Sequence, residues 1–246
     1  MSKPFAKPNL EIMEWPQQIN GTPILYDAPL EILLEHIKGH SAKTGPAFVA
    51  LAAHSSEQSL AALVSAAKGK DADFRRAAVE AIACHSLGIT QAKLICDLFQ
   101  DSDEIVVRAA CRAASNLKLS ESHSQILALL NSKNPKTREV ALEALNNLWL
   151  DSDFEQVFKV HTTDRNSNVR KQAAWTLQKN IAQKNWSKLF EIWHKDETSR
   201  HRVWACELAA QFGSESTLPI LEKLSNDRDG HVRKAAKKAI GILSAN

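Results

Sequence analysis

The chain has 246 residues, of which 44% are hydrophobic and 24% charged, a composition typical of soluble globular proteins. It contains no apolar run resembling a signal peptide and no stretch of 18 consecutive apolar residues, so we expect no membrane span. The net charge is +3, but residues 159–246 carry 16 Lys and Arg against 9 Asp and Glu, so this part could attract acidic partners or nucleic acid.

Residues 1–27 differ from the rest of the chain, because isolated apolar residues stand between polar gaps and prolines without a helical stripe. We predict an extended N-terminal arm that packs on the first repeat, and a mobile partner-binding tail is the alternative. Residues 28–55 contain two helical stretches, PLEILLEHIKG and GPAFVALAAH. They are predicted to form a degenerate capping repeat, since terminal repeats are atypical.

Residues 56–246 are predicted to form six repeats, each marked by one arginine. The steps between these arginines are 33, 30, 32, 32 and 31 residues, and a small residue follows each arginine three positions later. The arginines are Arg75, Arg108, Arg138, Arg170, Arg202 and Arg233. A period near 31 indicates one supersecondary unit that is repeated and stacked.

Each repeat is predicted to hold two helices, A and B. The B helix starts just before the arginine and carries small or apolar residues on one face, as in Val140, Ala141, Ala144 and Leu145. The A helices carry larger apolar stripes that include Trp186 and Trp193, and Trp204 falls in a B-helix core column. Predicted N-caps of the A helices are Thr90, Ser120, Asp151 and Ser214.

An acid stands six residues before several of the repeat arginines, at Asp164, Asp196 and Asp227. An acid in the turn, close to a basic helix start, suggests hydrogen bonding between repeats. We therefore interpret the repeat arginines as structural.

The pattern D-x4-VR-x2-A occurs as DRNSNVRKQAA (164–174) and DRDGHVRKAA (227–236) and resembles HEAT repeats of the phycobilisome-lyase type. The resemblance covers residues 56–246, although KNPKTREVA lacks the acid. It implies an all-α, right-handed superhelix of about six to seven helical pairs, with A helices on the convex side and B helices on the concave side. Bilin lyases carry such repeats, so a bilin-lyase-like accessory role is implied by repeat type alone.

The candidate binding surface is the concave face of the B helices, at positions +1, +5 and +8 from each arginine. Trp175 stands out there as a large aromatic residue in a polar column, a residue type enriched at recognition sites. The second repeat places Ala109 and Ala113 on this face. The predicted partner-binding residues are Trp175, Lys171, Gln178, Glu139, Glu143, Glu207, Lys234 and Lys238.

Candidates for metal binding and catalysis are few. His36 and His40 have i, i+4 ligand spacing, but Gly39 between them marks a helix end, and no cysteine belongs to a C-x-x-C pair. Cys111 and Cys206 fall in core columns and are expected to be reduced, buried thiols, consistent with a cytoplasmic protein. No nucleophile elbow or phosphate-binding loop is present, so we expect no catalytic residues, no metal and no cofactor.

These features favour a non-catalytic protein-binding scaffold or adaptor whose partner is another protein. Nucleic-acid binding through the basic C-terminal repeats is the alternative. It needs a continuous cationic track, which Glu139, Glu143 and Glu207 interrupt.

Overall fold

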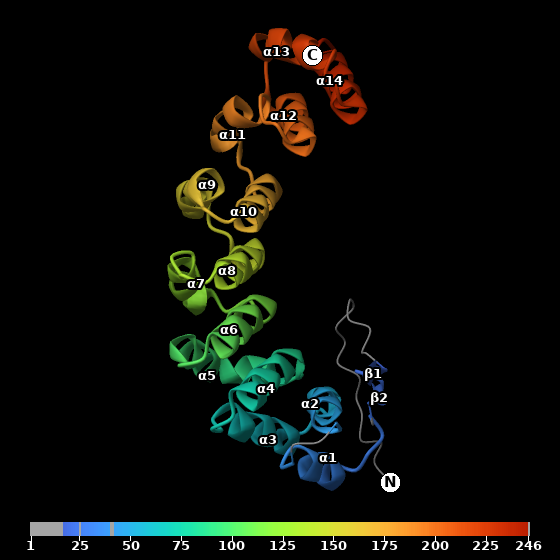
Figure 1. Cartoon of the computed structure of the whole chain (residues 1–246), viewed down its shortest axis with the longest axis vertical. Helices are drawn as coiled ribbons and strands as arrows, with labels where there is room; N and C mark the ends of the chain where they lie inside the picture. The colour runs from blue at the N-terminus through green and yellow to red at the C-terminus, as the bar shows by residue number, and fades with distance from the viewer. Residues whose placement is uncertain (1–16, 25, 40–41, 246) are drawn as a thin grey trace. The chain divides into compact units, whose positions relative to one another are not determined.

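Helices account for nearly all the regular structure of this protein in its computed structural model, which describes residues 17–24, 26–39 and 42–245 (Figure 1). The predicted arm lies largely in residues 1–16, outside the described residues. The described residues divide into two units, one comprising residues up to 150 with 159–173 and the other 151–158 with residues from 174 onward. The boundary passes through α9 (Phe154–Thr163) and α10 (Ser167–Lys179).

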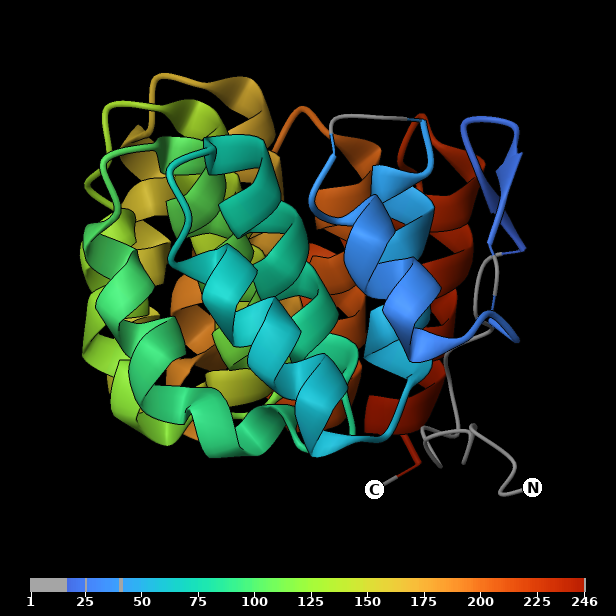
Figure 2. The same cartoon turned by 90° about the horizontal axis from the view of Figure 1, so that it is seen from below.

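The first unit begins with a short antiparallel hairpin of β1 (Gln18–Ile19) and β2 (Thr22–Pro23). Asn20 and Gly21 form its turn with positive φ values of 48° and 79°, the backbone that a two-residue Asn-Gly hairpin requires. The hairpin lies beside α2 (Thr44–Ala53), as Figures 1 and 2 show.

Helical pairs follow the hairpin in the first unit. The B helices α2, α4, α6 and α8 pack on one another in sequence order, and each contacts the A helix that precedes it. The helices are α1 (Leu30–His36), α2 (Thr44–Ala53), α3 (Glu57–Ala67), α4 (Ala72–Cys84), α5 (Ala92–Asp97), α6 (Glu104–Asn116), α7 (His123–Leu129) and α8 (Pro135–Leu148). Small residues in the B-helix core columns, such as Ala78, Ala110 and Ala141, are fully buried, which allows this close stacking.

The second unit contains two complete helical pairs in addition to the segments of α9 and α10 that belong to it. The B helices α12 (Ser199–Phe212) and α14 (Gly230–Leu243) pack on each other and on their A helices, α11 (Trp186–Trp193) and α13 (Leu218–Leu224). Trp193 is fully buried and Trp204 is 8% exposed, as their core assignment predicted.

Three of the predicted A-helix N-caps, Thr90, Ser120 and Ser214, are wrong, because none of these side chains caps a helix. These helices are preceded by 3₁₀ turns that hold the predicted residues, namely Gly88–Gln91, Ser120–Ser122 and Asp151–Asp153, and Ser214 precedes a fourth turn without a side-chain capping bond. A 3₁₀ turn tightens the helix start with backbone bonds, so a capping side chain is not required. Side-chain caps occur on B helices, where Asp103, Asn134 and Asp229 accept bonds from backbone N–H groups, and on the A helix α3, where the Ser56 hydroxyl accepts from the Ser59 N–H.

The all-α, HEAT-like superhelical class of about six to seven helical pairs is confirmed, with no strand between residues 56 and 245 of the described chain. α7 ends at Leu129 and α8 begins at Pro135, which places the break where the repeat register predicts it. The finer division into an arm (1–27), a capping repeat (28–55) and six repeats (56–246) stays a prediction. No helix among the described residues is long and apolar enough to cross a bilayer.

Candidate functional site

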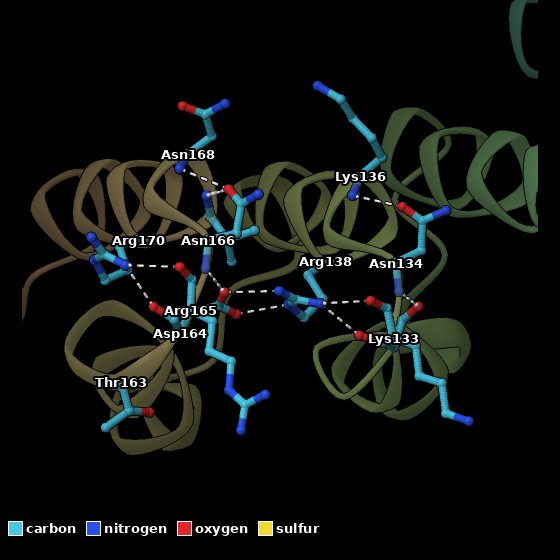
Figure 3. Close-up of polar contacts among 12 residues, drawn as sticks. Lys133, Asn134, Lys136, Arg138, Thr163, Asp164, Arg165, Asn166, Asn168 and Arg170 are labelled. Carbon is cyan, nitrogen blue, oxygen red and sulfur yellow. Dashed lines mark hydrogen bonds and ion pairs between the residues drawn. The ribbon is translucent and has the colours of Figure 1, made fainter.

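Three of the six repeat arginines join successive repeats through two bonds to a carboxylate. Arg138 donates from Nε and Nη2 to both carboxylate oxygens of Asp164, at 2.7 and 2.8 Å (Figure 3). Arg202 bonds Asp227 in the same way at 2.8 and 2.9 Å, and Arg75 bonds the carboxylate of Asp101 at 2.8 Å through both nitrogens. Each rung therefore links an arginine to the acid of the following turn in the bidentate geometry that guanidinium and carboxylate share.

Five of the six repeat arginines also bond to carbonyls of their own turn, Arg108 being the exception. Nη1 of Arg138 donates to the carbonyls of Ser132 and Lys133, at 2.8 and 3.3 Å (Figure 3). Arg233 makes the equivalent bonds to the carbonyls of Asp227 and Arg228, at 2.8 and 3.1 Å. These bonds satisfy carbonyls that the A helix and the turn leave without helical partners.

The rungs are shielded from water. The side chains of Arg138 and Asp164 are 13% and 8% exposed, and those of Arg202 and Asp227 are 7% and 11% exposed. Hydrogen bonds from Arg202 lower the pKa of Asp227, and those from Arg75 lower the pKa of Asp101. We call these three pairs the arginine ladder; they give these arginines a structural role. They confirm the predicted inter-repeat bonding at Asp164 and Asp227, whereas Asp196 accepts a hydrogen bond from the Thr198 N–H of its own repeat.

Arg108 of the second repeat makes a different set of bonds, because the following turn, KNPKTREVA, lacks the acid. Arg108 donates from Nη1 to the Thr137 hydroxyl at 3.3 Å and forms an ion pair with Glu104 of its own helix at 3.5 Å. Glu104 in turn accepts a hydrogen bond from the side-chain amide of Asn134 in the next turn. A shared glutamate and neutral groups thus replace the buried carboxylate at this rung.

The predicted binding residues of the first unit lie at the surface of the B helices. Glu143 and Lys171 are exposed, whereas the side chain of Glu139 is 18% exposed and pairs with Lys136 at 3.3 Å. The second repeat contradicts the expected pattern, because Ala109 and Ala113 are almost completely buried. Both belong to α6, which packs between α4 and α8, and a methyl group is too short to extend past that packing to solvent.

Trp175 is the exposed end of an aromatic cluster in the second unit. The residue is 46% exposed, and the centroid of its ring lies 6.0 Å from that of Trp204. Trp204 contacts Trp193 at 5.4 Å and His201 at 5.4 Å, and both of these rings are buried. We call these four residues the tryptophan cluster; it packs one side of Trp175 against rigid rings and leaves the rest of that ring available to a partner.

A groove lies between α12 and α14 in the second unit, with a volume of about 490 Å³. It gathers three predicted residues, Glu207, Lys234 and Lys238, and their charges are exposed. We call this feature the α12/α14 groove. Its apolar floor is formed by Val203, Cys206, Ala210, Ala235, Ala239 and Ile242. Gln178, the remaining predicted residue of this unit, is half-buried on α10 and does not line the groove.

Sequence reasoning missed part of this groove. Cys206 and Ala239 are fully buried along the groove and Ala235 is half-buried, and Ile242, which the sequence analysis did not predict as a surface residue, is 37% exposed at the end of α14. The groove could have been anticipated from the run of small residues on α14, which leaves a depression between α12 and α14. Burial raises the pKa of the Cys206 thiol to about 12, so it contributes apolar surface rather than a nucleophile.

Metal ligands do not gather in the described residues, where no group of three or more His, Cys, Asp or Glu side chains could hold an ion. His36 ends α1, while His40 lies outside the described residues. All four cysteines are free, and Cys111 and Cys206 are fully buried, as their core columns predict.

Stacked helical pairs that are joined through an arginine ladder define the α-solenoid class of repeat scaffolds. Residues 60–146 and 186–246 match the family described as HEAT repeats, and the chain belongs to that family. This match confirms the HEAT-like repeat type indicated by the D-x4-VR-x2-A pattern. No curated protein matches the chain significantly.

Solved structures with the same fold share little sequence with the chain. A chain from a homology model of the full-length AP-3 complex in an intermediate open conformation is 14% identical with a TM-score of 0.64, over 87% of this chain and 44% of that one. An engineered protein is 19% identical with a TM-score of 0.57, over 87% and 68% of the two chains. The complex of CpcE and CpcF of phycocyanin lyase from Nostoc sp. is 14% identical with a TM-score of 0.52, over 95% and 98%.

Proposed function

We propose that this chain is a non-catalytic protein-binding scaffold whose exposed B-helix residues contact a partner protein. The observation that carries the proposal is Trp175, an indole that is 46% exposed and supported by the ring of Trp204. A side chain held in place by packed rings loses little conformational freedom on binding, and tryptophan is enriched among the residues that dominate interface energies.

The charged residues of the proposed face support the same function. In the second unit Glu207, Lys234 and Lys238 are exposed, and no ion pair or side-chain hydrogen bond engages them within the described chain. Charges that remain uncompensated at a surface steer a complementary partner and set its orientation. Two of the structurally similar chains come from multi-protein complexes, which agrees with a scaffold role.

The alternatives have weaker support. A nucleic-acid interface needs a continuous cationic track, and Glu207 lies on the same groove as Lys234 and Lys238. A bilin-lyase-like accessory role rests on repeat type, which many unrelated functions share.

The test compares Trp175→Ala with Ile89→Ala, a matched removal of another exposed apolar side chain, which is 52% exposed. The partner is isolated from the native host with the unaltered chain, identified by mass spectrometry, purified and titrated by calorimetry. We expect Trp175→Ala to weaken binding by roughly 30-fold or more, the effect of losing about 2 kcal/mol at a central anchor, while Ile89→Ala binds normally.

Equal affinity of Trp175→Ala and the unaltered chain would overturn the anchor role. Thermal unfolding of both variants separates a binding defect from a folding defect. If Trp175→Ala unfolds, Trp175→Phe provides the second measurement, because the smaller ring retains packing against Trp204 and should lose only part of the affinity.

A further inference from the structure

The α12/α14 groove combines two chemistries that suit one kind of ligand. Its floor is apolar and made largely of small side chains, and its edge on α14 carries Lys234, Lys238 and His231. From this combination we propose that the groove binds an acidic peptide segment of a partner protein, with an apolar side chain seated on the floor and flanking carboxylates paired with the lysines. The inference rests on the proposed scaffold function and names the partner's chemistry.

The floor is suited to an apolar side chain. Ala210, Ala235 and Ala239 leave space between the two helices, and Ile242 adds an exposed aliphatic surface at one end. The opening holds about 490 Å³, within the range of protein sites that take a few side chains. Removing such a surface from water contributes on the order of 25 cal/mol per Å² of apolar area, which makes the floor the main source of affinity.

The rim is suited to carboxylates. Helix α14 carries Arg233, Lys234, Lys237 and Lys238 and no acidic residue. Lys234 and Lys238 are one helical turn apart on the groove side, so two carboxylates one helical turn apart in a peptide could meet both. Glu207 across the groove is its one lining carboxylate, and it disfavours a ligand whose negative charge is continuous along its whole length.

An acidic peptide fits these features better than a nucleic acid does. The groove is lined by two lysines and no arginine, and its wall holds no Phe, Tyr or Trp side chain for a base to stack on, the imidazole of His231 being its one ring. A phosphate backbone would also pass close to Glu207 on α12. The apolar floor would remain unused by such a ligand.

The test uses arrays of synthetic 14-residue peptides, each carrying one Leu, Ile or Phe flanked by Glu or Asp. Companion peptides replace the acids with Gln, or replace the apolar residue with Ser. The protein is the full chain. We expect retention of acidic peptides that contain the apolar residue, and loss of retention in both companion sets. An oligothymidylate of 15 nucleotides is the nucleic-acid ligand in the same assay.

Lys238→Glu is compared with Lys237→Glu, which makes the same charge change one residue away on α14 but outside the groove. We expect Lys238→Glu to weaken the best peptide about tenfold or more, mainly through its association rate, and Lys237→Glu to act much less. Ile242→Glu should also weaken it, because it places a carboxylate against the apolar end of the floor. Ile242 is partly exposed already, so the variant should fold.

Three results would overturn the inference: equal effects of Lys238→Glu and Lys237→Glu, equal retention of Gln and Glu peptides, or preferential binding of oligothymidylate that Lys238→Glu abolishes. Circular dichroism of each variant shows that the fold is retained. If Trp175→Ala weakens the native partner while Lys238→Glu and Ile242→Glu leave it unchanged, the scaffold function stands and the acidic-peptide assignment fails. If the groove variants act and Trp175→Ala does not, the Trp175 anchor fails instead.

Discussion

Replacing Arg202, an arginine of the ladder, with alanine should destabilise the second unit far more than replacing Arg233. Arg202 makes two bonds to the Asp227 carboxylate and two to the carbonyls of Asp196 and Glu197. Arg233 makes the two carbonyl bonds alone and is exposed. The two variants Arg202→Ala and Arg233→Ala therefore differ mainly by one shielded guanidinium–carboxylate pair.

The magnitude follows from what is left behind. In Arg202→Ala the Asp227 side chain, which is 11% exposed beside Arg202, keeps its charge but loses its partner. Breaking a buried pair in this way costs about 3–5 kcal/mol. Because Asp227 keeps some exposure to solvent, we expect Arg202→Ala to lower the free energy of unfolding by about 3 kcal/mol. Exposed carbonyl bonds contribute about 1 kcal/mol, which is the expected loss for Arg233→Ala.

The assay is urea unfolding followed by far-ultraviolet circular dichroism, with amide hydrogen exchange used to assign each transition to one unit. Asp227→Asn and the double variant with Arg202→Ala complete a thermodynamic cycle, in which we expect a coupling energy of roughly 1.5–3 kcal/mol. Equal destabilisation by Arg202→Ala and Arg233→Ala, or a coupling near zero, would refute the structural role of the rung.

Two further predictions concern ionisable groups. The pKa of Asp101 and Asp227 is lowered by bonds from arginine, so their stabilisation is complete above the unfolded value of about 3.9 and is lost as the pH falls through the folded values. The free energy of unfolding should therefore fall below about pH 4, with a smaller slope in Arg202→Ala, and an unchanged slope would contradict this assignment. Burial raises the pKa of Cys111 and Cys206 to about 12, so iodoacetamide at pH 8 should leave both unmodified in the folded chain, as peptide mapping by mass spectrometry can check. Early modification of Cys111 would show that α6 opens readily.

The repeating arginine made most of the fold predictable, because its spacing locates every B helix of the repeat array. The acids at Asp164 and Asp227 likewise predicted bonds between repeats, and both are found in rungs.

Other features depend on packing that a pattern does not encode. Thr90 and Ser120 have capping side chains but lie inside 3₁₀ turns, because backbone bonds already close the starts of those helices. Ala113 has the same register as Trp175, yet its methyl group is buried while the indole reaches solvent. Side-chain length, rather than helical phase, decided exposure at these two positions. The depth of the α12/α14 groove similarly depends on the distance between two helices.

The sequence separation between the arginine and the aspartate is nearly the same in every pair of the ladder, and this has a consequence for how the gene can lengthen. Each rung joins an arginine to an aspartate 25 or 26 residues later, so it spans a little less than one repeat. Unequal crossing-over between equivalent codons of two repeats would add or delete a whole period and re-form the same rung at the new junction. The turn that begins at Ser132 is different, because a repeat copied from that turn would bring no carboxylate to Arg108, the arginine of the preceding repeat. Lengthening of this array by duplication should therefore be tolerated best where the copied turn begins with aspartate.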